Sequence, residues 1–487
     1  MREHLFSLVA VAVSAALTLT LTQTDATAKI RLPQIIGDHM ILQQQSSANI
    51  WGTATPSAKV NVKVSWSNEK HSTTADKDGK WKIAINTPSG SYNKGSITIS
   101  DKDGAVTLTD VLIGEVWLCG GQSNMEMPLE GFYACPIEGA EEAILTAGKW
   151  KDRVREVKIP KTGALTPQDT VEGKWVETTP ETAMKFTAAG WYFATMLNSA
   201  LDVPVGIVAC NWGGSAVESW LPKEVVYSYE ENTIPSNSHE PKKDPGGWYN
   251  CTSSYVMYNG MLVPVSNYTI KGFLWYQGET NAGLYGYYAE RLAKMVSIWR
   301  DLWGQGEIPF YEVELAPWKY GGDGTTGARI REAQHNAVKL IPNSGIVCTN
   351  DLVYEYEADQ IHPCQKRGVG ERLALLALNR TYGMSSLPCE GPEFKDFTVN
   401  GNKVIVNFTN TQYTSLSPWH DIQGFEVAGE DRVFHPAKAE RRDHSVVVTC
   451  EQVSEPVAVR YCFRDFQKGN LTGAINLPAV PFRTDNW

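Results

Sequence analysis

Three residues whose side chains together can carry out acyl transfer occur in this sequence: the serine Ser123, the histidine His362 and the carboxylate Asp359. Ser123 follows Gly120-Gly121-Gln122, where the glycines permit a sharp turn, and we expect a helix to begin directly after it. The hydroxyl then lies at a helix N-terminus, where backbone N–H groups favour developing negative charge. Ser123 is therefore the predicted nucleophile, and an N-cap role, which serine favours, can coexist with it.

His362 is the predicted base, and Asp359 lies three residues before it. On a turn, residues at this spacing fall on one side, so the carboxylate can accept the imidazole N–H and stabilise the protonated ring. Asp359 is therefore the predicted acid of a Ser–His–Asp triad. With a histidine as the base, the rate is expected to rise through a pKa of about 6 to 7.

Acyl transfer also requires donors for the oxyanion that forms on the carbonyl oxygen. The candidates are the backbone N–H groups of Ser123 and Gly213 and the side-chain amide of Gln277. Glu279 cannot donate when it is ionised, so it is interpreted as a residue that orients its neighbours. An ordinary salt bridge explains Glu279 equally well.

Other chemistries have weaker support. The sequence contains no His-x-His, His-Glu-x-x-His or Asp-x-Asp-x-Asp-Gly pattern and no Gly-x-x-x-x-Gly-Lys loop, so no metal and no cofactor is expected. A glycosidase with two catalytic carboxylates stays open, because the sequence does not give the distance between two carboxylates.

The elements that position these residues form an α/β unit. Short apolar strands are expected at 116–119, 205–210, 273–276, 310–315 and 346–348, and amphipathic helices at 285–302 and 366–382. Apolar strands that alternate with helices indicate a parallel sheet covered on both faces. Ligands bind beyond the carboxyl ends of such strands, where Ser123, Gly213 and Gln277 lie in the sequence.

Strand patterns flank this unit on both sides. Alternating residues with turn signals predict a small antiparallel β-sandwich over 29–109, and a second β domain is expected over 388–487. The α/β unit then spans 110–387.

Residues 1–28 have the pattern of a signal peptide, with Arg2, an uncharged run from Leu5 to Leu21 and the small-residue site Ala26-Thr27-Ala28. Cleavage after Ala28 predicts a secreted or periplasmic protein, or a lysosomal or extracellular one in a eukaryotic host. An uncleaved membrane anchor is the alternative, because the run is barely long enough to span a bilayer. No later run is that long, so no stable membrane insertion is expected after cleavage.

The composition restricts partners and covalent links. A formal net charge of −10 argues against a nucleic-acid partner, which needs a basic face. The nine cysteines are an odd number, so at least one stays unpaired. We expect some buried free thiols and one to three disulfides.

Several segments together resemble the sialate O-acetylesterase family of the SGNH hydrolase superfamily. They are 111–118, Gly121-Gln122-Ser123-Asn124-Met125, 212–220, Trp275-Tyr276-Gln277-Gly278-Glu279, 331–334 and Asp359-Gln360-Ile361-His362-Pro363. Further likenesses at 40–43 and 478–485 extend the match over nearly all of 29–487. The resemblance implies a flavodoxin-like SGNH domain, a triad of Ser123, His362 and Asp359, and no metal. Gln122 and Gln277 depart from the wider superfamily pattern, and both departures are typical of this subfamily.

The substrate implied by this resemblance is an O-acetylated sialic acid. Its carboxylate favours a cation such as Arg331, while Trp212 and Glu279 are candidates for contact with the sugar. Acetylated xylan or another polysaccharide is the alternative, for which Trp212, Trp220 and Trp318 could line an aromatic groove. A carbohydrate-binding protein without catalysis is a third hypothesis, against which the three triad residues argue.

Overall fold

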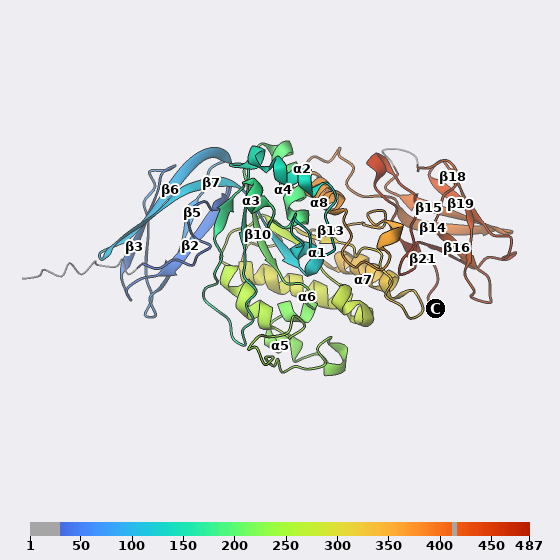
Figure 1. The fold of residues 1–487 in the computed structure, drawn as a ribbon, viewed down its shortest axis with the longest axis horizontal. Helices are drawn as coiled ribbons and strands as arrows, with labels where there is room; N and C mark the ends of the chain where they lie inside the picture. The colour runs from blue at the N-terminus through green and yellow to red at the C-terminus, as the bar shows by residue number, and fades with distance from the viewer. Residues whose placement is uncertain (1–29, 412–415) are drawn as a thin grey trace, which may run out of the picture.

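Three parts follow one another along the chain and along the long axis of the molecule (Figure 1). The computed structural model describes residues 30–411 and 416–487, so the predicted signal peptide lies outside the described residues. A β-rich part at one end and a β-rich part at the other flank a central α/β part. Among the described residues, none of the helices combines the length and the apolar character needed to cross a membrane.

The central sheet is parallel apart from one edge strand. Its order is β13-β12-β11-β7-β10-β8-β9, with only β9 antiparallel to its neighbour. The strands are β7 (Gly104–Gly121), β8 (Val154–Lys158), β9 (Trp175–Glu177), β10 (Val205–Asn211), β11 (Gly272–Tyr276), β12 (Phe310–Val313) and β13 (Ser344–Val347). Every residue of β10 and β11 is buried, as expected for strands covered on both faces. The predicted α/β fold class is confirmed.

Four long helices cover the two faces of this sheet. Trp117 of β7 packs against Phe193 of α4 (Ala188–Leu201), which itself packs on α8 (Lys366–Arg380). On the other face, Trp275 packs edge-on against Trp299 of α6 (Tyr285–Trp303), and α6 packs on α7 (Thr326–Leu340). The short helices are α1 (Ser123–Glu126), α2 (Ala140–Leu145), α3 (Pro180–Ala183) and α5 (Lys223–Val226).

The N-terminal part shares a strand with the central sheet. Its strands are β1 (Ile41–Gln43), β2 (Ser47–Thr53), β3 (Lys59–Val64), β4 (His71–Thr74), β5 (Lys80–Asn86) and β6 (Ser91–Asp101). β2 pairs with β5, whereas β3, β6 and β1 connect to the first half of β7. The predicted domain boundary between residues 109 and 110 thus lies inside β7.

The C-terminal part has its own hydrophobic core between two small antiparallel sheets. Their strands are β14 (Glu393–Asn400), β15 (Lys403–Thr409), β16 (Phe425–Ala428), β17 (His435–Pro436), β18 (Lys438–Arg442), β19 (Ser445–Thr449), β20 (Ala458–Tyr461) and β21 (Phe482–Arg483). Arg483 binds Glu332 of α7 through two hydrogen bonds of 2.9 Å, which fixes this part on the central one.

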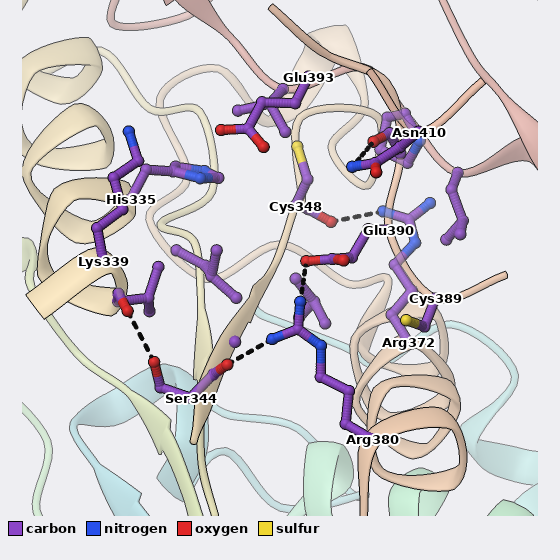
Figure 2. Close-up of a pocket in the computed structure, with 18 residues that line it drawn as sticks. His335, Lys339, Ser344, Cys348, Arg372, Arg380, Cys389, Glu390, Glu393 and Asn410 are labelled. Atoms are coloured by element: carbon purple, nitrogen blue, oxygen red, sulfur yellow. Dashed lines mark hydrogen bonds and ion pairs between the residues drawn. The ribbon is translucent and has the colours of Figure 1, made fainter. Parts of the chain in front are cut away.

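A cavity of about 220 Å³ lies where the chain enters the C-terminal part (Figure 2). Arg380 of α8 donates to Glu390 and Arg372 donates to the Cys348 carbonyl, so α8 holds both the entering chain and the end of β13. None of the predicted catalytic or substrate-binding residues lines this cavity.

The nine cysteines are all free, so the prediction of one to three disulfides is wrong for this structure. Six of them are buried, where a thiol packs as a small apolar side chain. They are Cys119, Cys135, Cys210, Cys348, Cys364 and Cys462. A chain of this size buries enough apolar surface to fold without covalent staples.

Candidate active site

Ser123 lies directly beyond the carboxyl end of the central strand β7. Gly121 has a φ of +135° and approaches β11 so closely that a Cβ there would lie 2.2 Å from the Tyr276 carbonyl oxygen. The next residue, Gln122, donates its backbone N–H to the same carbonyl at 2.9 Å. The chain then turns into α1, whose first residue is Ser123. The expected helix is thus a single turn, and the serine is half-buried at its start.

His362 contacts the nucleophile candidate. Its Nε2 lies 2.8 Å from the Ser123 Oγ, although the two residues are 239 positions apart in the sequence. The ring is half-buried and packs edge-on against Phe132, with 5.3 Å between the ring centroids. A serine hydroxyl hydrogen-bonded to an imidazole is the arrangement required for general-base activation.

The environment of His362 keeps the ring neutral. Burial and, to a smaller extent, the charge of Lys366 lower the pKa of His362 to about 4, and Glu126 opposes both. This pKa lies below the range of 6 to 7 predicted for an ordinary histidine, because the ring is desolvated and a cation lies nearby. The imidazole is therefore already in the form that accepts a proton at neutral pH.

Asp359 does not hold His362 in this structure. Its side chain is 82% exposed, and its carboxylate lies 3.4 Å from the Lys319 ammonium. Within residues 30–411 and 416–487, no hydrogen bond joins Asp359 to His362. The predicted contact between acid and base is thus absent from this arrangement, because the loop turns the Asp359 side chain toward solvent.

Gly213 lies beside Ser123, but a carboxylate occupies its N–H. A Cβ on Gly213 would lie 3.3 Å from the Ser123 Cβ, which confirms that the two residues are neighbours. The Gly213 N–H donates to Glu126 Oε2 at 2.6 Å, while Glu126 Oε1 lies 2.7 Å from the Lys161 ammonium. Sequence reasoning missed Glu126, whose only signal is its position three residues after Ser123 on the same helical turn.

The side chain of Gln277 points away from the nucleophile. Its Nε2 donates to the Ser215 carbonyl at 2.9 Å and to Asn281 Oδ1 at 2.8 Å, and its Oε1 accepts from the Tyr288 hydroxyl at 3.1 Å. Both amide hydrogens are thus engaged inside the protein, and the residue is fully buried. The predicted oxyanion donor does not match this geometry, in which Gln277 braces the loop after β11.

Glu279 contacts Asn124, the residue next to the nucleophile, and its orienting role stays a prediction. Its Oε1 accepts from Asn124 Nδ2 at 2.5 Å, and burial raises the pKa of Glu279 while that hydrogen bond lowers it. Asn124 also accepts from the ammonium of Lys366 at 2.9 Å. Sequence reasoning missed Asn124 and Lys366, because nothing in the sequence shows that residues 242 positions apart share one buried cluster.

The two remaining substrate candidates differ in position. Trp212 is half-buried and follows β10, and its backbone N–H donates to the Gly121 carbonyl at 3.0 Å, so it lies next to the turn before Ser123. Its contact with a sugar stays a prediction. Arg331 is 1% exposed and donates to the backbone carbonyls of Arg464 and Asp465. The expectation that Arg331 binds a substrate carboxylate is wrong here, because the side chain fixes the C-terminal part instead.

Comparisons with known proteins identify the family of the chain. Residues 113–379 match the family model described as "Carbohydrate esterase, sialic acid-specific acetylesterase". The sialate O-acetylesterase of Homo sapiens is 28% identical over 437 residues, covering 82% of this chain and 80% of that protein. The enzyme of Mus musculus is 26% identical over 447 residues, covering 82% of each.

A solved structure resembles nearly the whole chain. It is the crystal structure of a novel carbohydrate acetylesterase from Xanthomonas citri, with a TM-score of 0.83 and 33% sequence identity. The match covers 94% of this chain and 100% of that chain, so it includes the two flanking β parts as well as the central one.

Proposed function

The chain belongs to the family of sialic acid-specific carbohydrate acetylesterases, and we propose that it hydrolyses O-acetyl esters on sialic acids, with Ser123 as the nucleophile and His362 as the base. The observation that carries the catalytic assignment is the 2.8 Å contact between Ser123 Oγ and His362 Nε2 at the carboxyl edge of the sheet. Because the family consists of esterases, the hypothesis of a carbohydrate-binding protein without catalysis is not needed.

The reaction divides into two steps. His362 accepts the proton of Ser123 as its oxygen attacks the acetyl carbonyl, and the protonated imidazole then gives that proton to the departing sugar oxygen. The acetyl group is now bound to Ser123. In the second step His362 takes a proton from water, the resulting hydroxide attacks the acetyl-enzyme, and acetate leaves as the proton returns to Ser123.

Glu126 determines whether the oxyanion can be received at Gly213. The tetrahedral intermediate requires donors at the position of its negative oxygen, and a carboxylate at 2.6 Å now occupies the Gly213 N–H. Rotation of Glu126 away from Gly213, toward Lys161, which already binds its other oxygen, frees that donor. In this proposal the backbone N–H groups of Ser123 and Gly213 then hold the oxyanion.

The geometry supports a Ser–His pair more directly than the predicted triad. Asp359 can act as the acid only if its carboxylate leaves Lys319 and turns toward the imidazole. Substitution of Asp359 distinguishes the two forms of the mechanism.

A neutral polysaccharide ester is the second candidate substrate, and the position of Arg331 favours it. The cation expected to bind the sialic acid carboxylate is buried against backbone carbonyls of the C-terminal part. Acetate release from O-acetylated sialic acid and from acetylated xylan, measured side by side, distinguishes the two. A kcat/KM at least tenfold higher on the sialic acid ester supports the first proposal, and the reverse supports the second.

Removal of the nucleophile tests the catalytic assignment itself. Ser123→Ala is expected to lower kcat on a small acetyl ester by about 10⁴ to 10⁶ while thermal unfolding stays near that of the parent. The matched control is Ser199→Ala, which removes an exposed hydroxyl on α4 and should leave kcat unchanged. Activity of Ser123→Ala near the parent value contradicts the assignment.

Export is a further part of the proposal, supported by the signal-peptide pattern of residues 1–28. N-terminal sequencing of protein recovered outside the cytoplasm is expected to begin at Lys29. An exported chain that retains Arg2 instead supports the uncleaved anchor.

A further inference from the structure

Two buried side chains hold the backbone on either side of His362. Asn124 Nδ2 donates to the Ile361 carbonyl at 3.0 Å, directly before the histidine, and Lys366 Nζ donates to the Pro363 carbonyl at 2.7 Å, directly after it. The ammonium of Lys366 also donates to Asn124 Oδ1 at 2.9 Å, which joins the two side chains. Asn124 in turn is the residue next to Ser123, so one connected cluster contacts the neighbours of both reacting side chains.

The cluster lies inside the protein rather than on its surface. Lys366 and Asn124 are 0% and 1% exposed. Glu279 completes the cluster with one oxygen on Asn124, and its second oxygen, Oε2, is buried without a hydrogen-bond partner. A buried ammonium is costly unless its donors and its charge are compensated, which here occurs through two oxygen atoms and the nearby Glu279 carboxylate. The fold thus buries the Lys366 ammonium where it binds the Pro363 carbonyl, directly after His362.

Nothing else in the described structure replaces the acid partner of the histidine. Asp359, the carboxylate expected there, faces solvent and Lys319. The charged groups that face the imidazole come from two other elements, Glu126 from α1 and Lys366 from α8. Their charges act on the ring in opposite directions, since Glu126 favours the protonated form and Lys366 disfavours it.

We propose that Asn124 and Lys366 are positioning residues that hold His362 against Ser123, and that the Lys366 cation, beside a ring that is already half-buried, disfavours its protonation. The inference rests on the proposed esterase function and adds to it the residues that hold the backbone on either side of the base. Burial lowers the pKa of Lys366 to about 8, so the side chain still carries its charge at neutral pH.

The test compares Lys366→Met with Glu126→Gln on a small acetyl ester across pH. Lys366→Met keeps the apolar stem but removes the charge and the donor to Pro363, so kcat is expected to fall about 10²-fold, the cost of a misplaced catalytic group, with KM little changed. The midpoint of the acid limb is expected to move to higher pH in Lys366→Met and to lower pH in Glu126→Gln. A purely structural role produces no such opposite shifts.

Matched variants keep the test decisive. Lys294→Met removes an exposed lysine on α6, away from His362, and is expected to leave both kcat and the midpoint at the parent values. Asn124→Ala removes the donor to Ile361 and is expected to lower kcat without the upward shift of the midpoint. Because the midpoint is a property of the folded molecules that remain active, partial unfolding of a variant does not alter it.

Titration of the His362 ring by NMR separates this inference from the esterase proposal. The resonance is assigned by its loss in His362→Asn, and its titration needs no catalytic activity. An inactive parent in which Lys366→Met still shifts this titration upward contradicts the esterase function but not the role of the cation. An unshifted titration in Lys366→Met, or a kcat per folded molecule within a few-fold of the parent, overturns the inference.

Discussion

Replacing Gln277 by alanine separates a bracing residue from an oxyanion donor. The side chain makes hydrogen bonds to the Ser215 carbonyl, to Asn281 Oδ1 and from the Tyr288 hydroxyl. Asn281 Oδ1 keeps a bond from the Val217 N–H, and Tyr288 keeps one to the backbone carbonyl of residue 277. Of these three groups, the Ser215 carbonyl is the one that loses its hydrogen bond from Gln277 without keeping another named above.

The magnitude follows from these contacts. An unsatisfied buried carbonyl costs about 1–3 kcal/mol, and each of the two other lost bonds contributes about 0.5–1.5 kcal/mol. We therefore expect the free energy of unfolding of Gln277→Ala to fall by about 2–6 kcal/mol. By contrast, kcat per folded molecule should stay within a few-fold of the parent, because no donor is removed from the reacting oxygen.

Urea unfolding and steady-state kinetics on a small acetyl ester, normalised to the folded fraction, measure the two quantities. Gln334→Ala is the matched control, since Gln334 is an equally buried glutamine on α7 that bonds to the residue 277 and Val313 carbonyls. Both variants should lose stability and keep their kcat. A Gln277→Ala variant of normal stability whose kcat falls about 10²–10³-fold, the usual effect of a lost oxyanion donor, refutes the bracing role.

Three further predictions concern the reaction. The pKa of His362 is lowered to about 4, so the rate should rise with pH through about 4 and be flat from pH 6 to 8; a midpoint between 6 and 7 in the pH–rate profile contradicts the burial argument. Asp359→Asn should change kcat by only a few-fold, since the carboxylate does not contact the imidazole, whereas a fall of about 10⁴ indicates a working triad. Treatment with EDTA should leave the esterase rate unchanged, and loss of activity that zinc restores contradicts a reaction carried by Ser123 and His362 alone.

The features that depend on local pattern could be predicted from the sequence. The apolar runs after residues 115, 204 and 272 form the last part of β7 and most of β10 and β11, and the periodic apolar residues of 285–302 form the buried face of α6. The Ser123 and His362 segments then meet because parallel strands end at one edge of the sheet. These features could be predicted because buried strands require runs of apolar residues, and short turns require turn-forming residues, and both are visible in the sequence.

The features that depend on side-chain direction could not be predicted in the same way. A spacing of three residues permits Asp359 to face His362, but the loop turns it outward. The sequence does not show that Arg331 is inaccessible, whereas in the structure α7 places it in the interior, against the C-terminal part. The importance of Lys366 arises from contacts with residues 124 and 363, and it is visible only when the chain is folded.

The strand β7 makes the nucleophile mechanically continuous with the N-terminal sheet. It has 18 residues, bends at Asp110, where φ is +54° and the pairing with β6 shifts, and ends two positions before Ser123. Its first half pairs with β6 and β1, and its second half pairs with β10 and β11. A paired strand cannot slide without breaking several hydrogen bonds at once. A force applied to the N-terminal sheet is therefore transmitted through β7 to the catalytic edge. A shortened enzyme that starts at residue 110 would therefore lack the first part of β7. Attachment of the protein to a solid support through the N-terminal sheet would instead leave β7 and the catalytic edge intact.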